Sequence, residues 1–165
     1  MTRKNRIKNF LITGMFFLGL GGWMLHLRIH PLAMDKENFI PFIAGIISVF
    51  ALPVLFYFRK TLAFAYITNG FLVIIGTIAM AGFSLEHFQG EPTLLNILLT
   101  STLSDIIILW TNFIIGKAVF DLEYLRSEAD PAPQGRFFRY PNMGWWWVHL
   151  FTVSAVFVLG KLLFK

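Results

Sequence analysis

Residues 93–116, with the sequence TLLNILLTSTLSDIIILWTNFIIG, decide the fold class of this chain. Their only charged side chain is that of Asp105. A helix needs about 20 mostly apolar residues to cross the hydrocarbon core of a bilayer. The stretch therefore predicts a membrane-spanning helix that carries one carboxylate.

The rest of the chain has the same apolar character. Hydrophobic residues make up 56% of the 165 residues and charged residues 14%, whereas soluble domains have about 45–50% and about 25%. The predicted spans are residues 10–27, 39–58, 61–83, 93–116 and 145–163. We therefore predict an all-α integral membrane protein, with five transmembrane helices in a compact bundle that forms a single membrane domain over residues 1–165.

The basic residues predict the orientation of this bundle. If the N-terminus is cytoplasmic, ten of the fourteen Lys and Arg residues lie on the inner side, where membrane proteins concentrate these residues. We therefore predict a cytoplasmic N-terminus and an outer C-terminus. Residues 117–144 become a cytoplasmic loop, into which the fourth helix continues. The expected location is the bacterial cytoplasmic (inner) membrane.

Two local features shape the second and third spans. Only Arg59 and Lys60 separate them, which predicts a tight hairpin. Pro53 lies inside the second span and should kink it, because proline has no backbone N–H for the helical hydrogen bond.

Several kinds of site are excluded or disfavoured. The chain has no cysteine, so iron–sulfur clusters and c-type haem are excluded. No nucleophile–base pattern, phosphate-binding loop or HExxH motif is present, so a catalytic role is not favoured. The basic residues lie at the ends of apolar runs, which indicates membrane orientation and no nucleic-acid partner.

Asp105 is the sharpest feature inside a span, since it lies almost midway between Thr93 and Lys117. A charged carboxylate at the bilayer centre costs about 2.5–3.5 kcal/mol on insertion scales. Ser101, Asp105 and Asn112 share one face of the predicted helix. Residue counts from the inner ends of the third and fourth spans place Asp105 level with Asn69.

Three interpretations of this polar seam stay open. A protonated Asp105 that donates a hydrogen bond to Asn69 would hold the two spans together. Alternatively, Asp105 with Asn69, Asn112 and Ser101 would form a proton or ion site on a transport path. The third interpretation pairs Asp105 with a basic residue of another subunit.

The histidines suggest a second candidate site. His26, Arg28 and His30 form an HxRxH sequence at the outer end of the first span, and His87 lies in the other outer loop. These residues are candidates for contact with a quinone or a b-type haem, or, with nearby carboxylates, for metal binding. The plainer interpretation is a polar cluster that meets headgroups and water.

From these features we expect a small integral membrane subunit of a larger inner-membrane complex. Quinol-linked electron transfer is the most specific form of this function, with haem b or quinone as the candidate cofactor. The partners would be the lipid bilayer and other membrane subunits. The alternative is a small proton- or ion-coupled transporter centred on Asp105, and a lipid-modifying enzyme ranks third.

Overall fold

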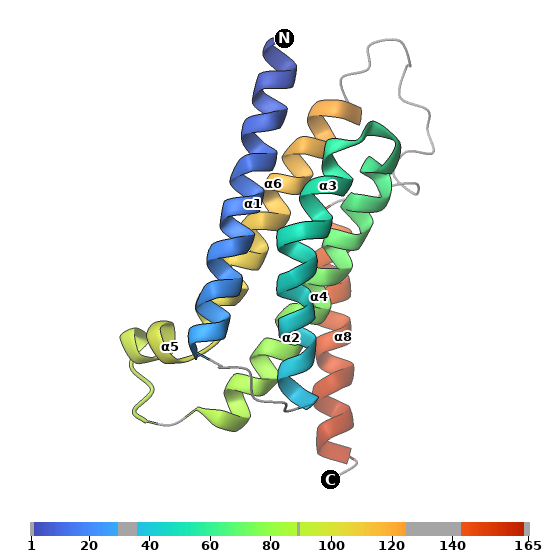
Figure 1. The fold of residues 1–165 in the computed structure, drawn as a ribbon. Coiled ribbons are helices and arrows are strands. Elements are labelled where there is room, and N and C mark those ends of the chain that lie inside the picture. The colour runs from blue at the N-terminus through green and yellow to red at the C-terminus, as the bar shows by residue number, and fades with distance from the viewer. Residues whose placement is uncertain (1, 30–35, 89, 125–142, 164–165) are drawn as a thin grey trace. The chain divides into compact units, whose positions relative to one another are not determined.

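The computed structural model describes residues 2–29, 36–88, 90–124 and 143–163, and these residues contain helices and no strand, which confirms the predicted all-helical class. They form two units, Met1–Ser127 and Glu128–Lys165. The elements, shown in Figure 1, are α1 (Arg3–Ile29), α2 (Lys36–Ile46), the π-helical turn η1 (Ile47–Ala51), α3 (Leu52–Tyr57), the 3-10 turn η2 (Arg59–Thr61), α4 (Leu62–His87), α5 (Leu94–Thr100), α6 (Leu103–Tyr124) and α8 (Met143–Leu163).

Within the described residues, three stretches are long and apolar enough to cross a membrane: Arg3–Arg28, Arg59–Ser84 and Leu103–Glu123. Two further apolar helices, Pro41–Tyr57 and Gly144–Gly160, are shorter. This is compatible with the expected multi-pass membrane protein. The count of five spans and the orientation stay predictions.

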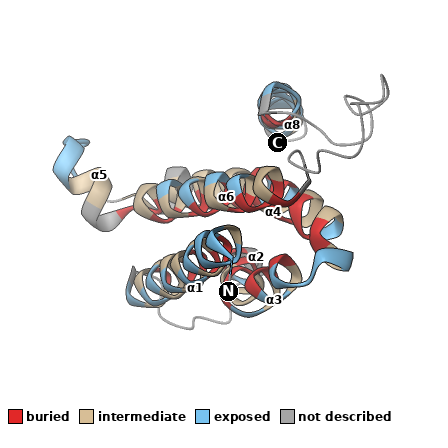
Figure 2. Ribbon diagram, turned by 90° about the horizontal axis from the view of Figure 1, so that it is seen from above, coloured by how far each residue is buried: buried red, intermediate tan, exposed pale blue. Residues whose placement is uncertain are grey.

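The first unit is built from four helical segments that pack side by side. α1 packs along α6, α6 packs along α4, and α4 packs against α2 and α3, which in turn contact α1. In the view down the bundle, α1 with α2 and α3 form one row and α4 with α6 form the other (Figure 2). Large side chains fill the space between the rows, among them Met15, Phe56, Tyr66 and Phe113.

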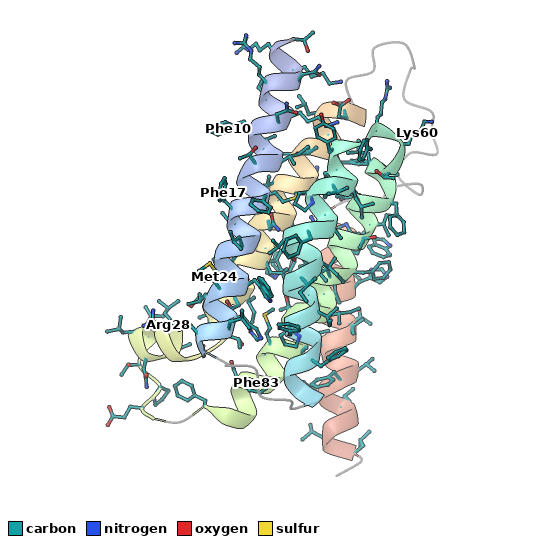
Figure 3. The ribbon with its side chains drawn as sticks, viewed as in Figure 1. Phe10, Phe17, Met24, Arg28, Lys60 and Phe83 are labelled. Carbon is teal, nitrogen blue, oxygen red and sulfur yellow. The ribbon has the colours of Figure 1, made fainter. Side chains whose placement is uncertain are left out.

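The outer face of α1 is apolar and unburied. Phe10, Phe17 and Met24 follow one another at intervals of seven residues, which places them on one helix face. Their side chains are 81%, 63% and 62% exposed, and they point away from the bundle (Figure 3). Such a face suits contact with lipid hydrocarbon.

The kink that Pro53 predicts takes the form of the π-helical turn η1. The backbone N–H of Leu52 bonds to the Ile47 carbonyl oxygen, five residues earlier, and Pro53 has no N–H to offer. A π-helical turn changes which side chains face inward. Here Ser48 is buried, while Phe50 is 54% exposed. The predicted hairpin is confirmed as η2, which joins α3 directly to α4.

The predicted boundaries of the fourth span, residues 93–116, are wrong. The structure has two helices, α5 and α6, with an extended residue at Ser101 (φ −108°, ψ 173°). Ser101 Oγ accepts a hydrogen bond from the Leu103 N–H, and Ser84 Oγ accepts one from the Thr102 N–H. Serine and threonine hydroxyls compete with helical backbone hydrogen bonds in this way. Asp105 consequently lies in the first turn of α6 and not at the middle of a span.

α6 continues to Tyr124, so the predicted continuation of the helix past Lys117 is confirmed, and Lys117 forms an ion pair with Asp121. The remainder of the predicted loop, residues 125–142, lies outside the described residues. In the second unit, the Trp145 ring stacks on His149 at a centroid distance of 3.6 Å. The His149 Nδ1 atom hydrogen bonds to the Trp145 carbonyl oxygen.

Candidate functional site

The packing of α1 against α6 brings a histidine and an aspartate together. His26 lies in the last turn of α1, and Asp105 lies in the first turn of α6. His26 Nδ1 is 3.7 Å from Asp105 Oδ2, and the two side chains are only 4% and 3% exposed. The two groups form a buried ion pair when His26 is protonated.

Glycines allow the helices around this pair to approach closely. A Cβ atom on Gly22 of α1 would lie 2.8 Å from a methyl carbon of Ile108 on α6. A Cβ atom on Gly45 of α2 would overlap the Trp23 ring of α1. Small residues permit such contacts between membrane helices. Both glycines therefore help to set the position of α1 around His26.

A cavity of about 30 Å³ lies beside the pair and is lined by residues of α1, α2, η1, α4 and α6. The polar residues in its lining are Trp23, His26, Ser48, Asp105 and Asn112. One water molecule needs about 10–15 Å³ of such volume, whereas pockets for small molecules measure roughly 300–1,000 Å³. The cavity therefore has room for about two water molecules or a small ion.

Several polar atoms around the cavity have no hydrogen-bond partner among the described residues. Among the described residues, no hydrogen-bond partner is found for Trp23 Nε1, Ser48 Oγ, the Asp105 carboxylate oxygens or the Asn112 amide. A buried polar group without a hydrogen bond costs roughly 1–3 kcal/mol by mutational measures. Several buried polar groups without hydrogen-bond partners in one place are typical of a site that binds water, a proton or a small ion.

Asp105 and Asn112 thus face one cavity, as their shared helix face predicts. The predicted hydrogen bond between Asp105 and Asn69 is wrong, because the Asn69 amide also has no partner among the described residues. Asn69 lies opposite Gly116 instead, with Nδ2 2.5 Å from where a Gly116 Cβ would be. Ser101 precedes α6 and bonds to the Ile97 carbonyl oxygen, so it lies apart from this cavity's lining.

The contacts between α4 and α6 explain this error of register. Trp110 Nε1 donates to Thr77 Oγ1 at 3.1 Å, and Asn69 lies beside Gly116, eleven residues beyond Asp105 on α6. The residue count that placed Asp105 level with Asn69 took Lys117 as the inner end of the span. The helix continues to Tyr124, so every residue of α6 lies farther from the inner end than predicted.

The remaining residues of the predicted histidine cluster are only partly described. Arg28 is exposed at the end of α1 (Figure 3). His30 and the side chain of His87 lie outside the described residues, so the joint cluster with His26 stays a prediction. Within the part of the chain that the structure describes, no three His, Asp or Glu residues are grouped as metal ligands.

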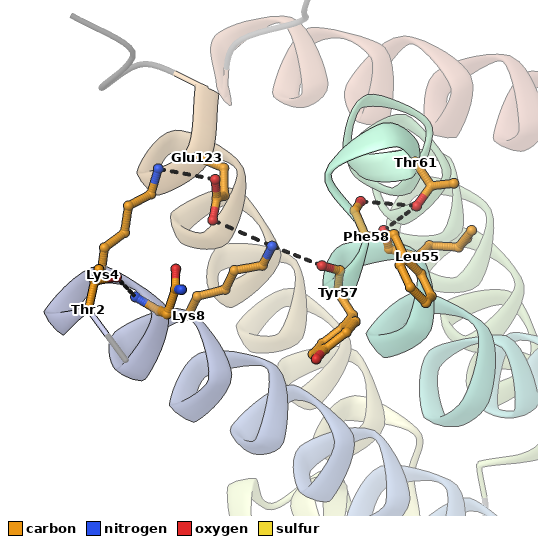
Figure 4. A network of polar contacts seen from close by, with 9 residues as sticks. Thr2, Lys4, Lys8, Leu55, Tyr57, Phe58, Thr61 and Glu123 are labelled. Carbon is orange, nitrogen blue, oxygen red and sulfur yellow. Dashed lines mark hydrogen bonds and ion pairs between the residues drawn. The ribbon is translucent and has the colours of Figure 1, made fainter.

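A second ionic cluster closes the opposite end of the α1–α6 pair. Glu123 of α6 contacts Lys4 at 3.1 Å and Lys8 at 3.4 Å. Lys8 also donates to the Tyr57 carbonyl oxygen at 2.9 Å (Figure 4). These contacts tie α1, α3 and α6 together beside the 59–60 hairpin.

The contact between His26 and Asp105 was not predicted, although the sequence carries one signal for it. Lys8 and His26 are eighteen residues apart, and so are Asp105 and Glu123. Two antiparallel helices with equal spacing between opposite charges can pair at both ends. This spacing is about 27 Å along a helix, close to the roughly 30 Å hydrocarbon core.

Comparison of the chain with known protein families, with curated proteins and with solved structures finds no match.

Proposed function

We propose that this chain is a small multi-pass membrane protein that transfers protons, with His26 and Asp105 as the protonation site. The observation that carries the proposal is the burial of both groups, 3.7 Å apart, at the edge of an apolar bundle. Ionisable residues inside a membrane domain are rare and mostly serve ion or proton pathways.

The chemistry of the pair suits this function. Histidine changes its protonation state near neutral pH. The Asp105 carboxylate lies within ion-pairing distance of the His26 imidazole, and both side chains line a cavity with room for water. A proton that arrives through the cavity can therefore be held by the pair and released again.

A gain in folding stability is by itself a weak explanation for the buried His26–Asp105 pair. Replacing a buried ion pair with well-packed apolar residues is often neutral or stabilising. The bundle also has a second ionic cluster, around Glu123, that joins the same two helices. Both considerations favour a functional role for the His26–Asp105 pair.

Proton transfer ranks above the quinol-linked subunit function because of the size of the cavity. A quinone ring or a haem beside His26 needs a pocket of several hundred Å³, and the cavity there measures about 30 Å³. The bacterial cytoplasmic membrane, with the N-terminus inside, remains the proposed setting.

Proton flux into vesicles tests the proposal. The purified protein is reconstituted into liposomes with a pH-sensitive dye inside, and a potassium diffusion potential drives protons inward. We expect flux well above that of protein-free vesicles. We further expect Asp105→Asn and His26→Gln to lower it at least tenfold, because each removes one titratable group of the pair.

Asp121→Asn is the matched control, since it neutralises a carboxylate of the same helix that pairs with Lys117. This variant should keep the wild-type flux. A wild-type rate equal to that of protein-free vesicles would overturn the proposal, as would unchanged flux in a folded Asp105→Asn variant.

A further inference from the structure

We infer that Ser48 and Asn112 extend the His26–Asp105 site inward as a path filled by about two water molecules. The inference deepens the proposed function and rests on it, since this water would carry protons to the pair. The hydration itself can be measured without any proton flux.

The path is defined by two layers of polar residues. His26 and Asp105 form the outer layer. Asn112 lies seven residues after Asp105 on α6, about 10 Å farther along the helix. Ser48 lies at a similar depth to Asn112. Gly22 of α1 contacts Ile108 of α6, and Gly19 lies one turn farther inward on α1. A Cβ atom on Gly19 would lie 3.1 Å from the Ser48 carbonyl oxygen. All four polar side chains line the same cavity.

The size and the lining of the cavity fit a short row of water molecules. Its volume of about 30 Å³ corresponds to about two waters. Two waters joined by hydrogen bonds of about 2.8 Å bridge polar atoms about 8 Å apart. Ser48, Asp105 and Asn112 are each at least 94% buried and have no hydrogen-bond partner among the described side chains and backbone groups.

Trp23 adds a donor between the two layers. Its Nε1 atom also lacks a partner within the described part of the chain, and its ring lines the cavity. A buried water commonly makes about three hydrogen bonds to polar groups. Carboxylate, hydroxyl, amide and indole groups together offer the donors and acceptors that two waters need.

A layer of closely packed side chains around Gly116 ends the path on the inner side. One turn beyond Asn112, the Met15, Phe56 and Asn69 side chains converge on Gly116 within 3.0 Å of its would-be Cβ position. Deeper still, Tyr66 stacks on Phe120 with ring centroids 4.6 Å apart. These contacts separate the water path from the Lys8–Glu123 cluster.

Hydroxyl-radical labelling with mass spectrometry tests the inference on three methionines of equal intrinsic reactivity. Met80 lines the cavity, Met15 is fully buried in the packed layer around Gly116, and Met24 lies on the outer apolar face of α1. Radiolysis of the full-length protein in lipid nanodiscs generates radicals from nearby water. We expect Met80 to be oxidised several-fold faster than Met15 and Met24.

Substitution of Ser48 and Asn112 tests whether these polar side chains bind the water in the cavity. Ser48→Ala combined with Asn112→Leu should lower the Met80 oxidation rate to that of Met15. Thr111→Val, on the exposed side of the same helix, should leave the rate unchanged. If the double variant does not fold, Ser48→Ala alone should still lower the rate at least twofold.

Equal oxidation of Met80 and Met15 in the wild-type protein would overturn the inference, whatever the proton flux. A labelled Met80 in a protein without proton flux would support the water path and overturn the proposed function. The oxidation experiment tests the water path, and the flux experiment tests the proposed function, so either can give a negative result without the other.

Discussion

Gly116 is the residue of α6 at which side chains from three other helices meet. A Cβ atom there would lie 2.5 Å from Asn69 Nδ2, 2.8 Å from Phe56 Cζ and 3.0 Å from Met15 Cε. These side chains belong to α4, α3 and α1. A hydrogen atom is all that the site accepts without displacing its neighbours.

We predict that Gly116→Ala lowers the free energy of unfolding by about 1–3 kcal/mol, the usual cost of overpacking a filled core. Gly14→Ala is the matched control, because no atom lies within 4 Å of the Cβ that it adds to α1. It should leave stability unchanged or raise it by up to about 1 kcal/mol through helix propensity. Thermal unfolding in detergent compares the two, and equal stability would contradict the close approach at Gly116.

At the scale of elements, the α1–α6 pair is held at both ends by ionisable side chains. His26 and Asp105 meet at one end, and Lys4 and Lys8 contact Glu123 at the other. The Lys4–Lys8–Glu123 cluster differs in that Lys8 has a second partner, the Tyr57 carbonyl oxygen. We assign this cluster a structural role, in contrast to the role proposed for the His26–Asp105 pair.

We predict that Glu123→Gln lowers the free energy of unfolding by about 1–3 kcal/mol, because it leaves the buried Lys8 ammonium without its carboxylate. Asp121→Asn removes a partly exposed pair within α6 and should cost no more than about 0.5 kcal/mol. Denaturant titration of the purified variants measures both. A smaller loss for Glu123→Gln than for Asp121→Asn would contradict the structural role.

At the scale of the whole molecule, the positions of the basic residues in the first unit bear on the predicted orientation. The contacts of Glu123 with Lys4 and of Lys8 with Tyr57 place the N-terminus of α1 beside the 59–60 hairpin. Arg28 lies at the other end of α1, opposite to Lys60 (Figure 3). Among the described residues, the bases of segments 3–8 and 59–60, which predict a cytoplasmic side, therefore lie at one end of the bundle.

Labelling of single cysteines tests the predicted orientation, and the chain offers a clean background because it has no cysteine. With the N-terminus inside, a membrane-impermeant maleimide should label Arg28→Cys in intact cells. It should label Lys60→Cys only after the membrane is permeabilised. The opposite pattern would reverse the orientation, and labelling of both from outside would contradict a membrane-spanning α1.

The sequence by itself determined the helical class, the apolar segments and the tight hairpin at Arg59 and Lys60. These features follow from hydrophobicity and chain connectivity, which act on neighbouring residues. It also placed Asp105 and Asn112 on one face, because helical periodicity is a local property.

Only the tertiary structure decided that Asp105 meets His26 and not Asn69. His26 and Asp105 lie on helices that are not consecutive, and periodicity carries no information about which helices are neighbours or how far one slides along another. Packing around Gly22 and Gly116, the interruption at Ser101 and the contacts of Glu123 set that register. Asn69 therefore lies beside Gly116, eleven residues beyond its predicted partner Asp105 on α6, and the carboxylate meets a buried imidazole.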